Sequence, residues 1–198
     1  MTAVPVKSWR DDVVTVPNAI SLARLACIPV FVWLLIGRDQ PIAAAALLAV
    51  LGATDWVDGW IARRFDQVSE IGKILDPTAD RLMFLVAIVT MLIDDRVPVW
   101  FAVVTLIREI LISVAALVLG ALGARRIDVT WWGKTSTFGL MFAFPLFLVG
   151  AADVVWSDIA QTLAWVIGVP SLALHWYAAW GYIPAGLAAL REGRAATS

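Results

Sequence analysis

Long apolar stretches alternate along the chain with short segments that hold most of the charged residues. A membrane-crossing α-helix needs about 20 mostly apolar residues. Six stretches approach or exceed that length, at about 19–36, 41–60, 75–93, 98–122, 131–149 and 156–190. The last is long enough to be tilted or broken near Pro170. The pattern predicts an all-α integral membrane protein with about six transmembrane helices and a single domain over residues 1–198.

The segment before the first stretch contains both basic and acidic residues. Lys7 and Arg10 stand beside Asp11 and Asp12, and no small-residue cleavage site follows the first apolar run. A secretory signal would need such a site. We therefore expect residues 1–16 to lie along the membrane surface as a short interfacial segment.

Composition excludes several classes of protein. The chain is 61% hydrophobic and 16% charged, whereas soluble domains are about 45–50% apolar and about 25% charged. This excludes a soluble enzyme, a disordered chain and a disulfide scaffold. The net charge of -1 offers no basic field for nucleic acid. With one cysteine and one histidine, Cys27 and His175, a bound metal would need oxygen ligands.

The distribution of lysine and arginine predicts the orientation in the membrane, because cytoplasmic loops are enriched in these residues. With alternating spans and a cytoplasmic N-terminus, only Arg38 and Arg96 fall outside. The inner side then holds Lys7, Arg10, Arg63, Arg64, Lys73, Arg125, Arg126, Lys134, Arg191 and Arg194. Both termini are therefore expected to be cytoplasmic.

Four aspartates lie at the predicted cytoplasmic ends of the second and third spans. Asp55 and Asp58 are three residues apart, and Asp76 and Asp80 are four apart, so each pair shares one face of a helix. The connecting loop is short, so the two helices run antiparallel and the carboxylates can converge. Charges within membrane segments are costly and commonly functional.

Such a cluster favours divalent cations, because converging carboxylates repel one another unless they bind cations or protons. Mg²⁺ prefers carboxylate oxygen and also binds substrate phosphates. Two ions could neutralise the site and accept a diphosphate, while Asp80 serves as general base. Gly59 and Ala62 allow a ligand to approach the backbone, and Arg63 could hold a phosphate. A purely structural reading pairs the aspartates with nearby Arg63, Arg64, Lys73 and Arg81.

The segment from Asp55 to Asp80 resembles the signature of the CDP-alcohol phosphotransferases (CDP-alcohol phosphatidyltransferases), D-x2-D-G-x2-A-R-x8-G-x3-D-x3-D. All eight specified residues match at their spacings over 26 positions. The resemblance extends to the six spans and to Pro17-Asn18-x2-Ser21-x2-Arg24 at the start of the first.

The resemblance implies a role for each matching position. Asp55, Asp58 and Asp76 look like ligands to two divalent ions, Mg²⁺ or Mn²⁺, and Asp80 like a further ligand and proton acceptor. The positions that resemble contacts to the CDP moiety are Asn18, Asp58, Gly59, Ala62, Arg63 and Ser69. The implied reaction is attack of an alcohol on the β-phosphate of CDP-diacylglycerol, which releases CMP.

The sequence indicates the acceptor alcohol less directly than it indicates the CDP-diacylglycerol donor. Arg108 and Lys134 could bind an acceptor phosphate, although Arg108 with Glu109 could also be a self-neutralising structural pair and Lys134 an interfacial lysine. Phosphatidylglycerophosphate synthases show a similar Arg-Glu and Gly-Lys, but usually have lysine where this chain has Arg81 and a second arginine after the Arg-Glu. Residues 110–122 contain no charge. Residues 133–139 look closer to actinobacterial cardiolipin synthases, which use phosphatidylglycerol.

Phosphatidylglycerol is therefore the favoured acceptor, and glycerol 3-phosphate is the alternative. His175, between aromatic residues, is expected to be a hydrogen-bonded packing residue, with contact to an acceptor headgroup as the other reading. The resemblance further implies a homodimer in a bacterial cell membrane, and the predicted orientation implies an active site that faces the cytoplasm. A divalent-cation transporter is a distant alternative, because transporters commonly contain repeats and midplane sites, and this chain shows neither.

Overall fold

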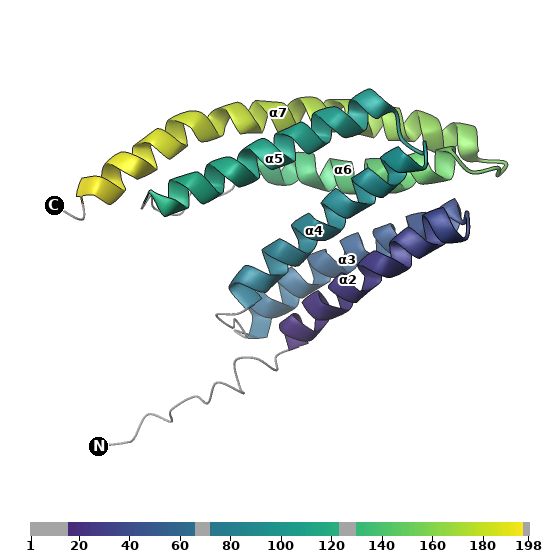
Figure 1. The fold of residues 1–198 in the computed structure, drawn as a ribbon, viewed down its shortest axis with the longest axis horizontal. Helices are drawn as coiled ribbons and strands as arrows, with labels where there is room; N and C mark the ends of the chain where they lie inside the picture. Colours follow the sequence, from purple (N-terminus) through teal and green to yellow (C-terminus); the bar gives the residue numbers. More distant parts are fainter. Residues whose placement is uncertain (1–15, 66–71, 123–129, 196–198) are drawn as a thin grey trace, which may run out of the picture. The chain divides into compact units, whose positions relative to one another are not determined.

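The computed structural model describes the backbone at residues 16–65, 72–122 and 130–195 (Figure 1). Side chains are described in these ranges except at 16–20, 55–65, 72–77 and several positions from 183 onward. The described backbone forms six α-helices and a π-helical segment, which confirms the all-α prediction. The elements are α2 (Val16–Val32), η1 (Trp33–Gly37), α3 (Pro41–Phe65), α4 (Gly72–Ile93), α5 (Val99–Ala121), α6 (Trp131–Gly150) and α7 (Ser157–Ala195).

The chain divides into two compact units, Met1–Asp94 and Asp95–Ser198. In the first unit, α2 packs against both α4 and α3. Its core contains large apolar side chains from α2, η1 and α4, with no exposed surface at Phe31, Leu35, Ile88 and Met91. The helix that carries the N-terminal part of the family-like pattern is thus the one that contacts both aspartate-bearing helices.

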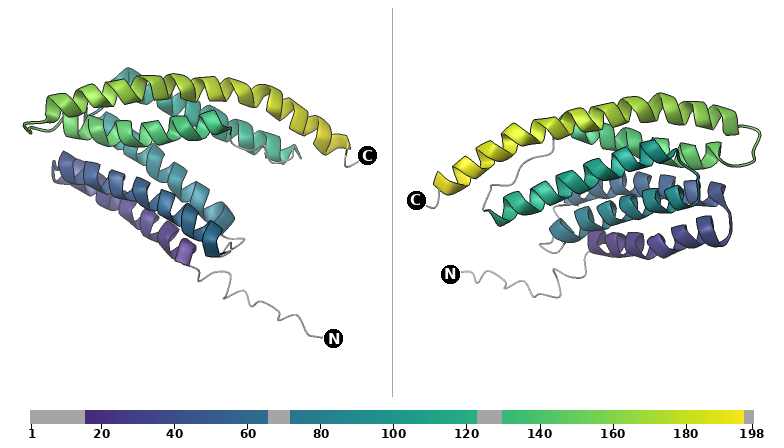
Figure 2. Two further views of the ribbon diagram at one scale, coloured as in Figure 1. Left: turned by 180° about the vertical axis from the view of Figure 1, so that it is seen from behind. Right: turned by 45° about the horizontal axis from the view of Figure 1, so that its top comes forward.

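In the second unit, α6 and α7 form an antiparallel pair, and α5 packs against α7. Both views in Figure 2 show α6 lying along α7. Phe101 of α5 contacts three rings of this pair, with centroid distances of 5.2 Å to Phe147, 5.7 Å to Phe144 and 6.0 Å to Trp165. Close contact between α6 and α7 depends on small residues such as Gly139 and Ser171 that face each other, as is usual between membrane helices.

Three helices are long and apolar enough to cross a membrane: Val99–Ala121, Trp131–Gly150 and Ser157–Tyr182. The described parts of the first unit add two shorter apolar helices, Ser21–Gly37 and Pro41–Thr54. Large apolar side chains on α5 face outward, and Leu117 is 74% exposed. An exposed apolar face of this extent suits lipid rather than water, so the chain is a membrane protein.

The helix limits agree with the apolar stretches to within a few residues at most ends, and α7 excludes one of the two alternatives left open for the last stretch. A break near Pro170 was possible from the sequence, whereas α7 is continuous from Ser157 to Ala195, through both Pro170 and Pro184. A proline removes one backbone hydrogen bond, and a helix can absorb this loss by bending. Figure 1 shows α7 as a bowed, unbroken ribbon.

Candidate active site

The four predicted metal-ligating aspartates lie on two consecutive helices. Asp55 and Asp58 belong to α3, and Asp76 and Asp80 belong to α4. The helical backbone at these positions confirms that each pair shares a face. Among the four, only Asp80 has a described side chain. Because the side chains of Asp55, Asp58 and Asp76 are not described, the four-aspartate site remains a prediction.

The side chains of the predicted CDP-contacting residues are likewise not described by the structure. Asn18 belongs to α2, and Gly59, Ala62 and Arg63 belong to α3, but their side chains are not described. Ser69 lies between α3 and α4, outside the described backbone. Their contacts with the nucleotide remain predictions.

Asp80 forms an ion pair with Arg24 of α2. Arg24 is 6% exposed, and the side chain of Asp80 is 35% exposed. The arginine is therefore buried between helices while the carboxylate keeps access to the surroundings. Sequence reasoning named other basic residues as partners for the aspartates. Arg24 did appear in the family-like pattern of the first span, and that was the signal that could have identified it.

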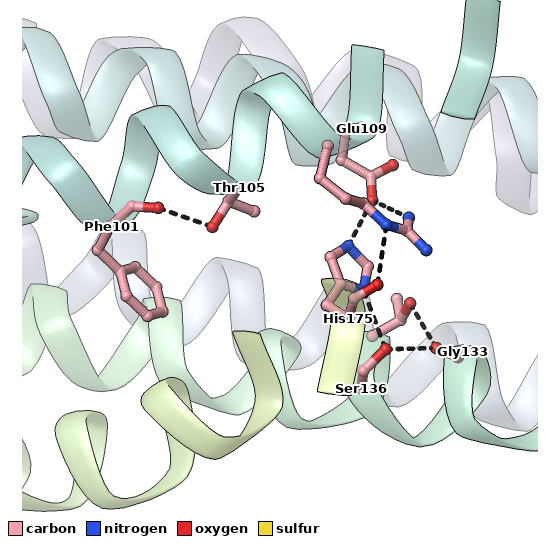
Figure 3. A network of polar contacts seen from close by, with 8 residues as sticks. Phe101, Thr105, Glu109, Gly133, Ser136 and His175 are labelled. Carbon is pink, nitrogen blue, oxygen red and sulfur yellow. Dashed lines mark hydrogen bonds and ion pairs between the residues drawn. The ribbon is translucent and has the colours of Figure 1, made fainter. Parts of the chain in front are cut away.

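The predicted acceptor-binding residues belong to the second unit, where Arg108 is part of a buried polar network. Its Nη1 donates to Glu109 Oε1 at 2.7 Å, and its Nε donates to the backbone carbonyl of His175 at 3.3 Å. The same carboxylate oxygen accepts from His175 Nε2 at 2.6 Å. His175 Nδ1 lies 2.9 Å from Ser136 Oγ. Figure 3 shows His175 between Glu109 on one side and Ser136 on the other.

The network ends at the first turn of α6, next to the second predicted acceptor residue. Ser136 Oγ donates to the carbonyl of Gly133 at 2.9 Å. Lys134 follows Gly133 directly and is exposed. The turn is itself capped, because the Thr130 side chain accepts from the Gly133 N–H at 3.2 Å. A chain of contacts thus joins the buried arginine to the turn that carries the exposed lysine.

The geometry agrees with the structural interpretation that the sequence allowed for Arg108 and for His175. Arg108 does pair with Glu109, and His175 is a buried, hydrogen-bonded residue, as expected. The sequence did not identify Ser136, or Glu109 as the partner of His175. Residues 39 and 66 positions apart meet there, and no local motif encodes such a contact.

A serine–histidine–glutamate chain also occurs in nucleophilic catalysis, where a base activates the hydroxyl. Here Ser136 and His175 both have no exposed surface. The serine hydroxyl also contacts the carbonyl of its own helix. A substrate cannot reach this oxygen, so the geometry suits positioning and not covalent attack.

Comparison with known sequences agrees with the aspartate signature. Residues 14–177 match the family described as CDP-alcohol phosphatidyltransferase. A cardiolipin synthase (CMP-forming) of Streptomyces coelicolor is 36% identical in an alignment that covers 87% of this chain and 83% of the relative. CDP-diacylglycerol–glycerol-3-phosphate 3-phosphatidyltransferases are also similar. The Bacillus subtilis enzyme is 34% identical over 67% of this chain and 76% of its own length. The Escherichia coli K12 enzyme is 36% identical over 67% of this chain and 76% of its own length. The chain belongs to the CDP-alcohol phosphatidyltransferase family.

Proposed function

We propose that this protein transfers the phosphatidyl group of CDP-diacylglycerol to phosphatidylglycerol, forming cardiolipin and releasing CMP. The complete aspartate signature on α3 and α4 is the observation that carries the reaction class. Two features support phosphatidylglycerol as acceptor. The Streptomyces coelicolor relative, which matches along most of the chain, has this activity in its name. The 133–139 segment also resembles cardiolipin synthases of the superfamily.

The donor set fits two divalent ions, Mg²⁺ or Mn²⁺. Asp55, Asp58, Asp76 and Asp80 supply only oxygen atoms, which hard cations prefer. The spacing of three and four residues on α3 and α4 supports this ligand set, because residues so spaced share one face of a helix. When bound, the ions would neutralise charge on the diphosphate of the donor.

Asp80 would accept the proton of the attacking alcohol. The acceptor oxygen forms a bond to the β-phosphorus of CDP-diacylglycerol, and the bond from that phosphorus to the oxygen of CMP breaks. The proton passes to the Asp80 carboxylate, which keeps partial exposure while Arg24 holds it. Asn18, Gly59, Ala62, Arg63 and Ser69 would position the cytidine and its phosphates.

Arg108 and Lys134 would bind the phosphate of the acceptor. Arg108 contributes directed N–H donors from a fixed guanidinium. Lys134 is exposed and carries positive charge at the first turn of α6. Both candidate acceptors contain a phosphate, so this contact suits glycerol 3-phosphate as well. The Bacillus subtilis and Escherichia coli relatives are named for that substrate, which makes phosphatidylglycerophosphate synthesis the second candidate.

An acceptor panel tests this proposal. Purified protein in detergent micelles receives CDP-diacylglycerol, Mg²⁺ and one of four acceptors: phosphatidylglycerol, glycerol 3-phosphate, inositol phosphate or serine. We expect CMP and cardiolipin only with phosphatidylglycerol. Product with glycerol 3-phosphate alone would establish the second candidate. Absence of CMP with all four acceptors would overturn the reaction class.

Substitution of Lys134 tests the acceptor contact separately. A charge-assisted hydrogen bond contributes about 1.5–3 kcal/mol, so Lys134→Ala should raise the acceptor KM at least about tenfold. The KM for CDP-diacylglycerol should change little. Arg38→Ala is the matched control, because Arg38 is also basic and exposed but lies outside the proposed site. An increase in the donor KM alone would place Lys134 on the donor side.

A further inference from the structure

The buried network in the second unit joins three helices through one residue. His175 on α7 contacts Glu109 on α5 and Ser136 on α6 (Figure 3). The His175–Glu109 contact measures 2.6 Å and the His175–Ser136 contact 2.9 Å. His175 and Ser136 have no exposed surface. Buried polar groups are costly unless they are hydrogen-bonded, and here Glu109 and the His175 carbonyl connect the network to Arg108.

We propose that Glu109, His175 and Ser136 are positioning residues for binding of the acceptor phosphate. They hold the guanidinium of Arg108 and the first turn of α6, which carries Lys134, in fixed positions. This inference rests on the proposed role of Arg108 and Lys134. None of the three residues contacts the substrate in this proposal. They act through the two basic residues.

The geometry of Arg108 supports this role. Glu109 and the His175 carbonyl engage Nη1 and Nε, so the guanidinium is held at two points. Among the described residues, no hydrogen-bond partner is found for Nη2. A guanidinium fixed in this way presents its remaining donors in a set direction. That lowers the entropy lost when a phosphate binds.

A simple neutralising pair would not need the remaining contacts. Glu109 alone balances the charge of Arg108. His175 then adds a second donor to the same carboxylate oxygen and anchors it to α7. Ser136 extends the anchor to the carbonyl of Gly133, which also accepts from Thr137 Oγ1 at 3.0 Å. The contacts made by His175 and Ser136 therefore fix the position of the Arg108–Glu109 pair and are not needed to balance its charge.

Charge complementarity assigns different tasks to the two basic residues. Arg108 is 6% exposed and already paired with a carboxylate, so it contributes direction more than net charge. Lys134 is exposed and supplies the positive charge that attracts an anion. The network links the backbone next to Lys134 to Arg108 through Gly133, Ser136 and His175. It therefore couples the position of Arg108 to that of the turn that carries Lys134.

Steady-state kinetics with CMP release as the readout test this inference. Phosphatidylglycerol is varied at saturating CDP-diacylglycerol, and the donor is then varied at saturating acceptor. The variants are His175→Phe, Ser136→Ala, Arg108→Ala and the double variant Arg108→Ala/His175→Phe. Thr105→Val is the matched control, because Thr105 is a fully buried hydroxyl on α5 that bonds only to Phe101 O among the described residues.

We expect His175→Phe and Ser136→Ala each to raise the acceptor KM about threefold to tenfold, the range for loss of an intramolecular hydrogen bond. The donor KM should stay within about twofold of the wild-type value, as should both constants for Thr105→Val. If His175 acts through Arg108, the double variant should have the same acceptor KM as Arg108→Ala alone.

Several outcomes would overturn the inference. One is an effect of His175→Phe that is as large in the Arg108→Ala background as in the wild type. Another is an unchanged acceptor KM for Ser136→Ala. Loss of folded protein in both single variants, with Thr105→Val folded, would show a purely structural role. If Arg108→Ala itself leaves the acceptor KM unchanged, the proposed function of Arg108 fails first. The single-variant results distinguish these cases.

Discussion

The contact between Gly139 of α6 and Ser171 of α7 leads to a prediction that connects packing with acceptor binding. A Cβ atom added at Gly139 would lie 2.9 Å from the Cβ of Ser171 and closer still to its Oγ. The hydroxyl can rotate away, but the Cβ can move only with the backbone. Gly139→Ala should therefore push α6 and α7 apart at this turn.

The expected cost follows from two opposing terms. Overpacking of a close interface costs about 1–3 kcal/mol, whereas alanine is more favourable than glycine in a helix by about 0.8–1 kcal/mol. Gly181→Ala on α7 isolates the second term, because nothing lies within 4 Å of its added Cβ. The free energy of unfolding should therefore be about 1–3 kcal/mol lower for Gly139→Ala than for Gly181→Ala. In a chain of this size, that corresponds to a Tm difference of about 2–12 °C.

Thermal unfolding in detergent, followed by tryptophan fluorescence, measures this difference. Ser171→Gly removes the opposing Cβ, so the double variant Gly139→Ala/Ser171→Gly should recover most of the loss attributable to the contact. Gly139 lies about one turn from Ser136, and Ser171 about one turn from His175. Separation of the helices should thus lengthen the 2.9 Å Ser136–His175 contact and raise the acceptor KM. Equal Tm values for Gly139→Ala and Gly181→Ala would refute the reasoning.

Three further predictions concern the donor side and the orientation of the chain. Three substitutions should abolish CMP release while membrane insertion is retained, because an amide lacks the anionic oxygen that a hard cation needs: Asp55→Asn, Asp58→Asn and Asp76→Asn. Near wild-type turnover at limiting Mg²⁺ would remove that residue from the ligand set. Arg24→Ala should lower kcat about tenfold or more, with little change in either KM, because Asp80 loses its ion-pair partner; unchanged kcat would exclude a positioning role. The topology can be tested by single-cysteine labelling in a Cys27→Ala background with an impermeant thiol reagent. Arg64→Cys should react only from the cytoplasmic side and Asp95→Cys only from the opposite side. Labelling of position 95 only from the cytoplasmic side would reverse the predicted topology.

The helices could be predicted from the sequence because apolar length is a local property. The expected span at 98–122 is observed as Val99–Ala121, and that at 131–149 as Trp131–Gly150. The behaviour of α7 at Pro170 could not be predicted in the same way. Whether a proline breaks a helix depends on how the segment bends and what surrounds it, and the sequence shows only the missing N–H.

Side-chain partners were harder to predict than helices. A helical pattern indicates which face of a helix is buried, but not which residues of another helix meet it. Arg24 and Asp80 are 56 positions apart, and the local candidates for pairing with Asp80 lay much closer in the sequence. The Glu109–His175 contact spans 66 positions. Both pairs form only through helix packing.

This difference explains why the reaction class can be read from the sequence more easily than the acceptor. The signature residues lie on two consecutive helices, so their spacing along 26 positions is itself a strong constraint on which residues share a face. The proposed acceptor contacts instead depend on α5, α6 and α7, which meet at His175. The Arg108-Glu109 motif by itself therefore does not predict which acceptor the enzyme uses. Its meaning depends on whether a partner such as His175 fixes the carboxylate, and acceptor specificity should accordingly respond to substitutions on α6 and α7 that never touch the substrate.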